Sequence, residues 1–165
     1  QIIPHPDGQH LLALSNSPEA IFIVDMEEVL DNEYVENTRD IQTGYLSLPA
    51  VTSSQDEGER TRAMIGSGKM LLHPDQNRLF VSNFNTNSIS IFDLSLGTYG
   101  REIAEIQSGG ENPYAMTFSP DSNELIVSNF TGDINDSQAN TTISIFDINP
   151  DSETVYTLLT QVVNK

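Results

Sequence analysis

The sequence contains no cysteine, few basic residues and no long hydrophobic run. Without cysteine, the chain can form neither disulfide bonds nor thiolate metal sites. No apolar stretch approaches the roughly 18 consecutive residues that a membrane-spanning helix needs. The first residues also lack the basic and apolar regions of a secretory signal peptide, so we expect mature or excised material. The lack of cysteine, with abundant Asn, Ser and Thr, favours a bacterial envelope (periplasmic) or extracellular protein.

Basic residues are outnumbered by acidic residues, 7 to 24, which gives the 165-residue chain a formal net charge of −17. A surface this negative repels nucleic acid and anionic lipid headgroups. We therefore expect neither nucleic-acid binding nor membrane insertion. Two interpretations of the charge remain, which are solubility in a salty medium and the binding of a cation or a basic partner.

Three segments of the chain share one pattern, in which a Pro-Asp turn is followed by a strand ending at Asn and a second strand ending at Asp. The segments begin at His5, His73 and Ser119. The spacing of the last two is close to the roughly 40–45 residues of a four-stranded propeller blade. Pro presets φ and Asp closes the turn with its side chain, and Ile143-Ser144-Ile145-Phe146 alternates as a strand does.

These repeats predict an all-β fold: a β-propeller of about three four-stranded antiparallel blades in an incomplete ring. Because three blades leave two sheet faces bare, other blades of a larger, seven-bladed propeller or other chains must complete the ring. The blades are expected at about 1–51 with an insertion at 27–44, at 69–107, and at 114–163 with a loop at 130–141; a further loop covers 52–68. The outer strands are expected at 45–51, 102–107 and 155–163, with a helical turn at 26–30.

Strands ending in Leu79-Phe80-Val81-Ser82-Asn83 and Leu125-Ile126-Val127-Ser128-Asn129 resemble the YVTN-type β-propeller repeat. Asn112-Pro113-Tyr114-Ala115, which precedes the third Pro-Asp turn, is similar to the first strand of that family's repeat. The resemblance implies a ring of about seven blades. It leaves the function open, because such propellers serve as surface-layer proteins, periplasmic binding modules, lactonases and parts of oxidoreductases.

Polar residues that recur at the same position of each repeat are expected to hold turns and strand ends. No catalytic residue is predicted among them. These residues are His5, His73 and Ser119 at the turns, Asn16, Asn83 and Asn129 at the end of one strand, and Asp25, Asp93 and Asp147 at the end of the next.

The loops 52–68 and 130–141 are not repeated and, because strands alternate in direction, we expect them on one face that binds a ligand or partner. The candidate residues on this face are Asp56, Glu57, Glu59, Arg60, Arg62 and Asn135. Arg60, Arg62 and Lys69 either pair with the acidic loops or hold an anionic ligand.

Alternate oxygen-bearing side chains in the second loop predict a calcium site, because Ca²⁺ prefers carboxylate and amide ligands. Its expected ligands are Asp133, Asn135, Asp136 and Ser137. This loop lacks the Gly and the distal Glu of an EF-hand, and the alternative is a solvated acidic loop.

Catalytic motifs are sparse, because the sequence has no nucleophile elbow, HExxH motif or phosphate loop. The histidines, His5, His10 and His73, lie outside the long loops. The sequence therefore favours a non-enzymatic binding or scaffold propeller that contacts a protein or glycan through loops 52–68 and 130–141. The alternative is part of a periplasmic oxidoreductase or a lactonase-like enzyme whose catalytic groups lie mostly outside this chain.

Overall fold

A computed structural model describes residues 1–16, 19–31, 42–48, 67–97, 99–131 and 140–163. These residues form three four-stranded antiparallel sheets and one short helix, α1. The predicted fold class, an incomplete β-propeller, is confirmed. The elements are β1 (Ile2–Pro4), β2 (His10–Asn16), β3 (Glu19–Asp25), α1 (Met26–Asp31), β4 (Gln42–Ser47), β5 (Ser67–Leu72), β6 (Arg78–Asn83), β7 (Ser88–Asp93), β8 (Arg101–Gln107), β9 (Pro113–Phe118), β10 (Glu124–Thr131), β11 (Asn140–Asp147) and β12 (Leu158–Val163).

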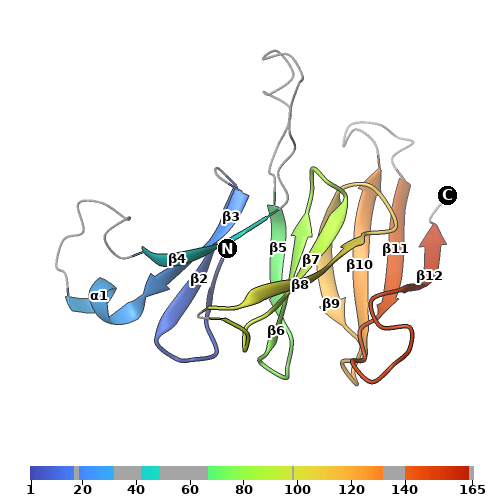
Figure 1. The fold of residues 1–165 in the computed structure, drawn as a ribbon. Coiled ribbons are helices and arrows are strands. Elements are labelled where there is room, and N and C mark those ends of the chain that lie inside the picture. The colour runs from blue at the N-terminus through green and yellow to red at the C-terminus, as the bar shows by residue number, and fades with distance from the viewer. Residues whose placement is uncertain (17–18, 32–41, 49–66, 98, 132–139, 164–165) are drawn as a thin grey trace, which may run out of the picture.

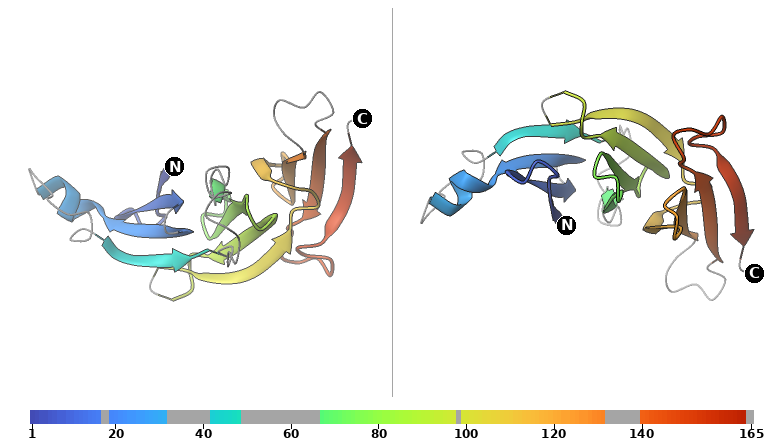
Figure 2. Two further views of the ribbon diagram at one scale, coloured as in Figure 1. Left: turned by 90° about the horizontal axis from the view of Figure 1, so that it is seen from above. Right: turned by 90° about the horizontal axis from the view of Figure 1, so that it is seen from below.

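Each sheet contains four strands that follow one another in the chain, in the orders β1 to β4, β5 to β8 and β9 to β12 (Figure 1). The sheets stand side by side along an arc (Figure 2). The first strand of each sheet, β1, β5 or β9, lies on the concave side of the arc, and the fourth strand lies on the convex side. In a closed propeller the blades surround a central channel, so the concave side corresponds to the channel.

The second sheet is covered on both faces, which explains why every residue of β6 is buried. Leu79 and Val81 contact the first sheet, whereas Phe80, which alternates with them, contacts the third. The strand β7 follows the same division, since Phe92 pairs with Leu79 and Ile91 pairs with Phe80. Each such side chain contributes about 1.5–3 kcal/mol when fully buried.

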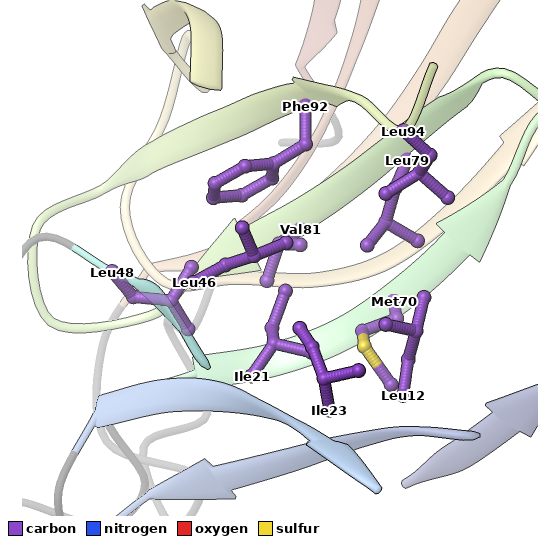
Figure 3. Close-up of a cluster of buried hydrophobic side chains, with 10 residues drawn as sticks. All are labelled: Leu12, Ile21, Ile23, Leu46, Leu48, Met70, Leu79, Val81, Phe92 and Leu94. Carbon is purple, nitrogen blue, oxygen red and sulfur yellow. The ribbon is translucent and has the colours of Figure 1, made fainter. Parts of the chain in front are cut away.

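Two separate hydrophobic clusters join the three sheets. The cluster between the first and second sheets contains Leu12, Ile21, Ile23, Leu46, Leu48, Met70, Leu79, Val81, Phe92 and Leu94 (Figure 3). The cluster between the second and third sheets contains Phe80, Ile89, Ile91, Leu125, Val127, Phe146 and Ile148. Packing of neighbouring sheets, rather than a single central core, therefore holds the arc together.

The turn between the first two strands is built alike in every sheet. In the second sheet, the His73 N–H donates to the Arg78 carbonyl at 2.8 Å, and Asp75 Oδ1 accepts the N–H groups of Asn77 and Arg78. Gln76 takes a positive φ of 60°. The equivalent bonds from His5 to His10 and from Ser119 to Glu124 measure 2.9 and 3.0 Å. These contacts agree with the turn role predicted for the recurring residues.

The strand register differs from the sequence alignment at one recurring position. The pairs His10–Asp25, Arg78–Asp93 and Glu124–Asp147 are equivalent. Counting from them, Ser15, and not Asn16, occupies the position of Asn83 and Asn129. Asn16 ends β2 as expected, but one more residue separates it from His10 than separates Asn83 from Arg78 or Asn129 from Glu124.

The outermost strand of the third sheet begins at Leu158, whereas the sequence predicted a strand from residue 155. Val155, Tyr156 and Thr157 belong to a turn that Asp147 organises. Its Oδ2 atom accepts the hydroxyls of Ser152 and Thr154 at 2.5 and 2.6 Å, and its carbonyl accepts the Tyr156 N–H at 2.7 Å. The predicted helical turn is present as α1, whose first turn is capped by Asp25 Oδ1.

Candidate functional site

The residues predicted for ligand and calcium binding lie outside the described part of the chain, so these assignments stay predictions. They are Asp56, Glu57, Glu59, Arg60, Arg62, Asp133, Asn135, Asp136 and Ser137. In the chain, β5 begins after the first group of these residues and β10 ends before the second group. The start of β5 and the end of β10 lie at the same end of the sheets (Figure 1). Within the described ranges, no three His, Asp or Glu side chains come together to form a metal site.

The innermost strands β5 and β9 contact each other at this end. A Cβ atom added to Gly68 would lie 3.0 Å from the Pro113 carbonyl oxygen and 2.5 Å from Ser82 Oγ, so only glycine allows this approach. Lys69 and Tyr114 directly follow Gly68 and Pro113, and both side chains are exposed. The strands that carry them, β5 and β9, lie on the concave side of the arc (Figure 2). We therefore take Lys69 and Tyr114 as the centre of the candidate site.

The backbone of β5 is fixed on both sides of Lys69. The Lys69 N–H donates to Ser82 Oγ at 2.9 Å. The Gln1 side chain bonds both backbone groups of Met70, accepting from its N–H at 2.8 Å and donating to its carbonyl at 3.0 Å. Gln1 thereby covers part of the free edge of β5 and joins the first sheet to the second.

The start of β9, and with it Tyr114, is fixed by Asn112. The Asn112 N–H donates to Asn87 Oδ1 at 2.7 Å, and its side-chain amide donates to the Phe130 carbonyl at 2.9 Å. Asn112 has a φ of 49°, in the left-handed region that Asn tolerates better than most residues. This conformation redirects the chain from the connection after β8 into β9.

Beside the candidate site, two buried asparagines bind the ends of the central strands together. Asn83 Nδ2 donates to Ser88 Oγ and Ser90 Oγ at 3.2 and 3.0 Å. Asn129 Nδ2 donates to the Ser108 carbonyl at 3.1 Å, with further bonds to two hydroxyls of β11. The Oδ1 atoms of both asparagines are buried and have no protein hydrogen-bond partner. A buried water molecule is the usual partner of such an atom.

Lys69 has a distinct electrostatic position among the described basic side chains. Arg78 is buried and bonded to Asp75 and to the Ile148 carbonyl. Arg101 is exposed, but it lies on the outer strand β8. Of the innermost strands, only β5 carries a cation in the part that the structure describes, so Lys69 can attract an anionic group to the concave side.

The sequence pointed to Lys69, as a cation near the predicted face, but it did not indicate Tyr114. The signal available for Tyr114 was its place directly after Pro113, at the start of an expected innermost strand. Lys69 supplies a charged hydrogen-bond donor, and Tyr114 supplies a hydroxyl beside an aromatic ring. Together these groups suit a polar ligand that carries negative charge and hydroxyl groups.

Comparison with known proteins identifies the family. The family described as "Lactonase, 7-bladed beta-propeller" matches residues 28–164. The chain belongs to this family. The general prediction of a propeller family is confirmed, whereas the narrower assignment to the YVTN-type repeat is not. None of the curated proteins compared with the chain matches it.

Solved structures support the same fold. The periplasmic gluconolactonase of Pseudomonas aeruginosa is 19% identical, with a TM-score of 0.65, over 98% of this chain and 39% of its own. A candidate 6-phosphogluconolactonase of Bacteroides uniformis is 16% identical, with the same TM-score, over 97% of this chain and 39% of its own. A protein of Lactobacillus plantarum is 19% identical, with a TM-score of 0.63, over 98% of this chain and 40% of its own. The chain thus spans about two fifths of the length of these propellers, roughly the share of three blades in seven.

Membership of the lactonase family corrects the predicted function. The prediction of a non-enzymatic binding or scaffold propeller is wrong, and the lactonase-like alternative agrees better with the family and with its named structural neighbours. The incomplete ring supports completion by other blades or chains, but no protein or glycan partner is supported. Among the described helices, none has the length and apolar character to cross a bilayer.

Proposed function

We propose that the chain forms three blades of a sugar lactonase, an enzyme that hydrolyses the cyclic ester of a sugar acid. The observation that carries this proposal is the family match over residues 28–164. The activities in the names of the solved neighbours, 6-phosphogluconolactonase and gluconolactonase, support a sugar-acid lactone as the substrate class.

Hydrolysis of such a lactone needs two kinds of assistance. Water adds to the ester carbonyl, the carbonyl oxygen becomes negative, and the bond to the ring oxygen then breaks to give a carboxylate and a hydroxyl. A fixed donor stabilises the negative oxygen, and a base takes a proton from the attacking water while the ring oxygen gains one. Lys69 suits the first task or the binding of an anionic substituent, and Tyr114 suits hydrogen bonding to a sugar hydroxyl.

The base for this reaction must come from another part of the ring. The innermost strands β1, β5 and β9 contain no His, Asp or Glu. We propose that these strands provide binding and electrostatic stabilisation, and that a side chain of a different segment provides the base. This division of roles is in keeping with a channel to which every blade contributes one strand.

Acid release from glucono-1,5-lactone, followed by continuous titration, tests the proposal. The complete protein that carries this chain should release acid faster than buffer alone. Lys69→Met should lower kcat/KM about tenfold or more if Lys69 stabilises the developing charge. The matched control Arg101→Met removes an exposed cation from the outer strand β8 and should leave the rate unchanged. A rate equal to that of buffer, for this lactone and for its 6-phosphate, would reject the function.

We also propose a periplasmic location. The named periplasmic gluconolactonase among the structural neighbours supports this location. Fractionation of the producing cells should recover the protein with periplasmic markers, and recovery with cytoplasmic markers would oppose the proposal.

A further inference from the structure

The free edge of β5 binds an oxygen acceptor from the neighbouring sheet. The Gln1 side chain accepts the Met70 N–H through Oε1 at 2.8 Å and donates to the Met70 carbonyl through Nε2 at 3.0 Å. These backbone groups point away from β6, because the His73 N–H bonds the Arg78 carbonyl and such groups alternate in direction along a strand. A side chain of the first sheet thus satisfies the strand edge of the second.

The third sheet has the same pair of backbone groups, on Met116. Met70 pairs with Val81 and Met116 pairs with Val127, each the fourth residue of its strand. The turn bond that sets the alternation is present in the third sheet as well. The Met116 N–H and carbonyl therefore point away from β10, on the concave side where β9 lies (Figure 2). Within the described residues, no group accepts the Met116 N–H.

Lys69 takes the position in the second sheet that Gln1 takes in the first. Lys69 directly precedes Met70. Gln1 directly precedes Ile2, which pairs with Ala13, the fourth residue of β2. The strands β5 and β9 contact each other, and a lysine side chain is longer than a glutamine side chain. Lys69 can therefore reach the edge of β9 as Gln1 reaches the edge of β5.

The Lys69 side chain is directed towards the third sheet. The register of β5 against β6 shifts just before Met70, so Gly68 and Lys69 both stand opposite Ser82. Ser82 shares its face of β6 with Phe80, since alternate residues of a strand lie on one face. Phe80 belongs to the cluster between the second and third sheets. The ammonium group of Lys69 therefore extends on the side where β9 lies.

Replacing an amide with an ammonium group changes what this position can bind. The Gln1 amide offers a donor and an acceptor, whereas the Lys69 ammonium offers donors alone. Lys69 can satisfy the Met116 carbonyl, but it leaves the Met116 N–H free. No carboxylate in the described ranges pairs with Lys69. A free N–H beside an ammonium group gives two donors for one anionic oxygen, and Gln1 Oε1 marks the corresponding place on β5.

We propose that the Met116 N–H and the Lys69 ammonium group together bind the carboxylate of a sugar acid. The choice of a sugar acid rests on the proposed function, because hydrolysis of its lactone releases this carboxylate. Tyr114 lies two residues before Met116 and shares its face of β9, which packs towards the second sheet. The Tyr114 hydroxyl is therefore available to a hydroxyl group of the same ligand.

Titration of the complete protein with gluconate, followed by NMR spectroscopy with isotopically labelled methionine, tests this site. The Met116 amide signal should shift as gluconate is added, because its N–H gains a hydrogen bond to the carboxylate. The Met70 amide is the internal control, since Gln1 already holds its N–H, and its signal should stay in place. An unmoved Met116 signal, or equal shifts of the two amides, would overturn the proposal.

Substitutions separate the two donors in calorimetric titration with gluconate. Lys69→Gln should weaken binding about tenfold or more, because it removes the charge and its amide oxygen can accept the Met116 N–H. Met116→Pro lacks the N–H and should also weaken binding about tenfold; proline is tolerated on an edge strand where the N–H makes no ladder bond. Met116→Ala, the matched control, keeps the N–H and should bind like the unchanged protein.

Equal affinities of Met116→Pro and Met116→Ala would overturn the role of the N–H, and unchanged affinity of Lys69→Gln would overturn that of Lys69. The NMR readout uses the unchanged protein, so it decides the matter even where Met116→Pro does not fold. Lactone hydrolysis with an unmoved Met116 amide would reject this site and leave the proposed function standing. A shifted Met116 amide without lactone hydrolysis would reject the function and leave the carboxylate site.

Discussion

Phe80 provides the sharpest test of how the blades are held together. Its side chain is fully buried between the second and third sheets. The ring meets Phe118 of the third sheet edge-on, with centroids 5.4 Å apart, and Phe118 meets His73 in the same way at 4.9 Å. Replacing Phe80 with Ala removes the ring and leaves a cavity, which costs about 3–5 kcal/mol. A typical domain has only about 5–15 kcal/mol of stability.

Urea unfolding followed by circular dichroism measures this loss in the 165-residue chain. The matched control is Tyr45→Ala, because Tyr45 is 63% exposed on the uncovered face of the first sheet. Substitutions at such a surface position usually change stability by about 0.5 kcal/mol or less. A loss below about 1 kcal/mol for Phe80→Ala, or a loss no greater than that of Tyr45→Ala, would refute packing between sheets as the main source of stability.

Three further predictions concern a turn, a close contact and a metal. Hydrogen bonds from Ser119 and Asn123 lower the pKa of Asp121 from 3.8 to about 2. The contribution of the Asp121 carboxylate to stability is therefore complete above pH 3.8 and is lost as the pH falls towards 2. Asp121→Asn should make stability depend less on pH in this range, as measured by fluorescence during acid unfolding. An unchanged pH dependence in this variant would contradict the assignment. Gly110→Ala places a Cβ 2.6 Å from Thr142 Oγ1. This substitution should lower the free energy of unfolding in urea by about 1–3 kcal/mol. An unchanged free energy of unfolding would show that the contact relaxes freely. Calorimetric titration with Ca²⁺ should give heat that Asp133→Ala abolishes, and the absence of heat from the unchanged protein would dispose of the predicted calcium site.

The three sheets could be predicted from the sequence because their signals are local and recur. Alternating side chains and Pro-Asp turns mark each strand pair, and both depend on residues close in the chain. Details that depend on contacts at a distance were not predictable. Val155–Thr157 has the composition of a strand, but the carboxylate of Asp147 holds it in a turn. The strand register, which pairs Ser15 with Ala20, decides that Ser15 and not Asn16 takes the position of Asn83.

The candidate site was harder to predict than the fold. Recurring residues such as His73 and Asp75 maintain the turns, so a repeat locates the scaffold without identifying the chemistry. The approach of Gly68 to the Pro113 carbonyl, which brings β5 and β9 together, joins segments far apart in the sequence. Tyr114 was missed for that reason. The function was wrongly predicted because membership of the family depends on the repeated blade sequence over residues 28–164 and not on a local catalytic motif.

A crystal structure of the complete protein that includes this chain tests whether the chain is three consecutive blades of a lactonase ring. We predict seven blades around one channel, with Lys69 and Tyr114 facing that channel and a further sheet packed on Ile143 and Val162. An open arc, or a ring in which the Ile143 face remains in solvent, would contradict the proposed architecture.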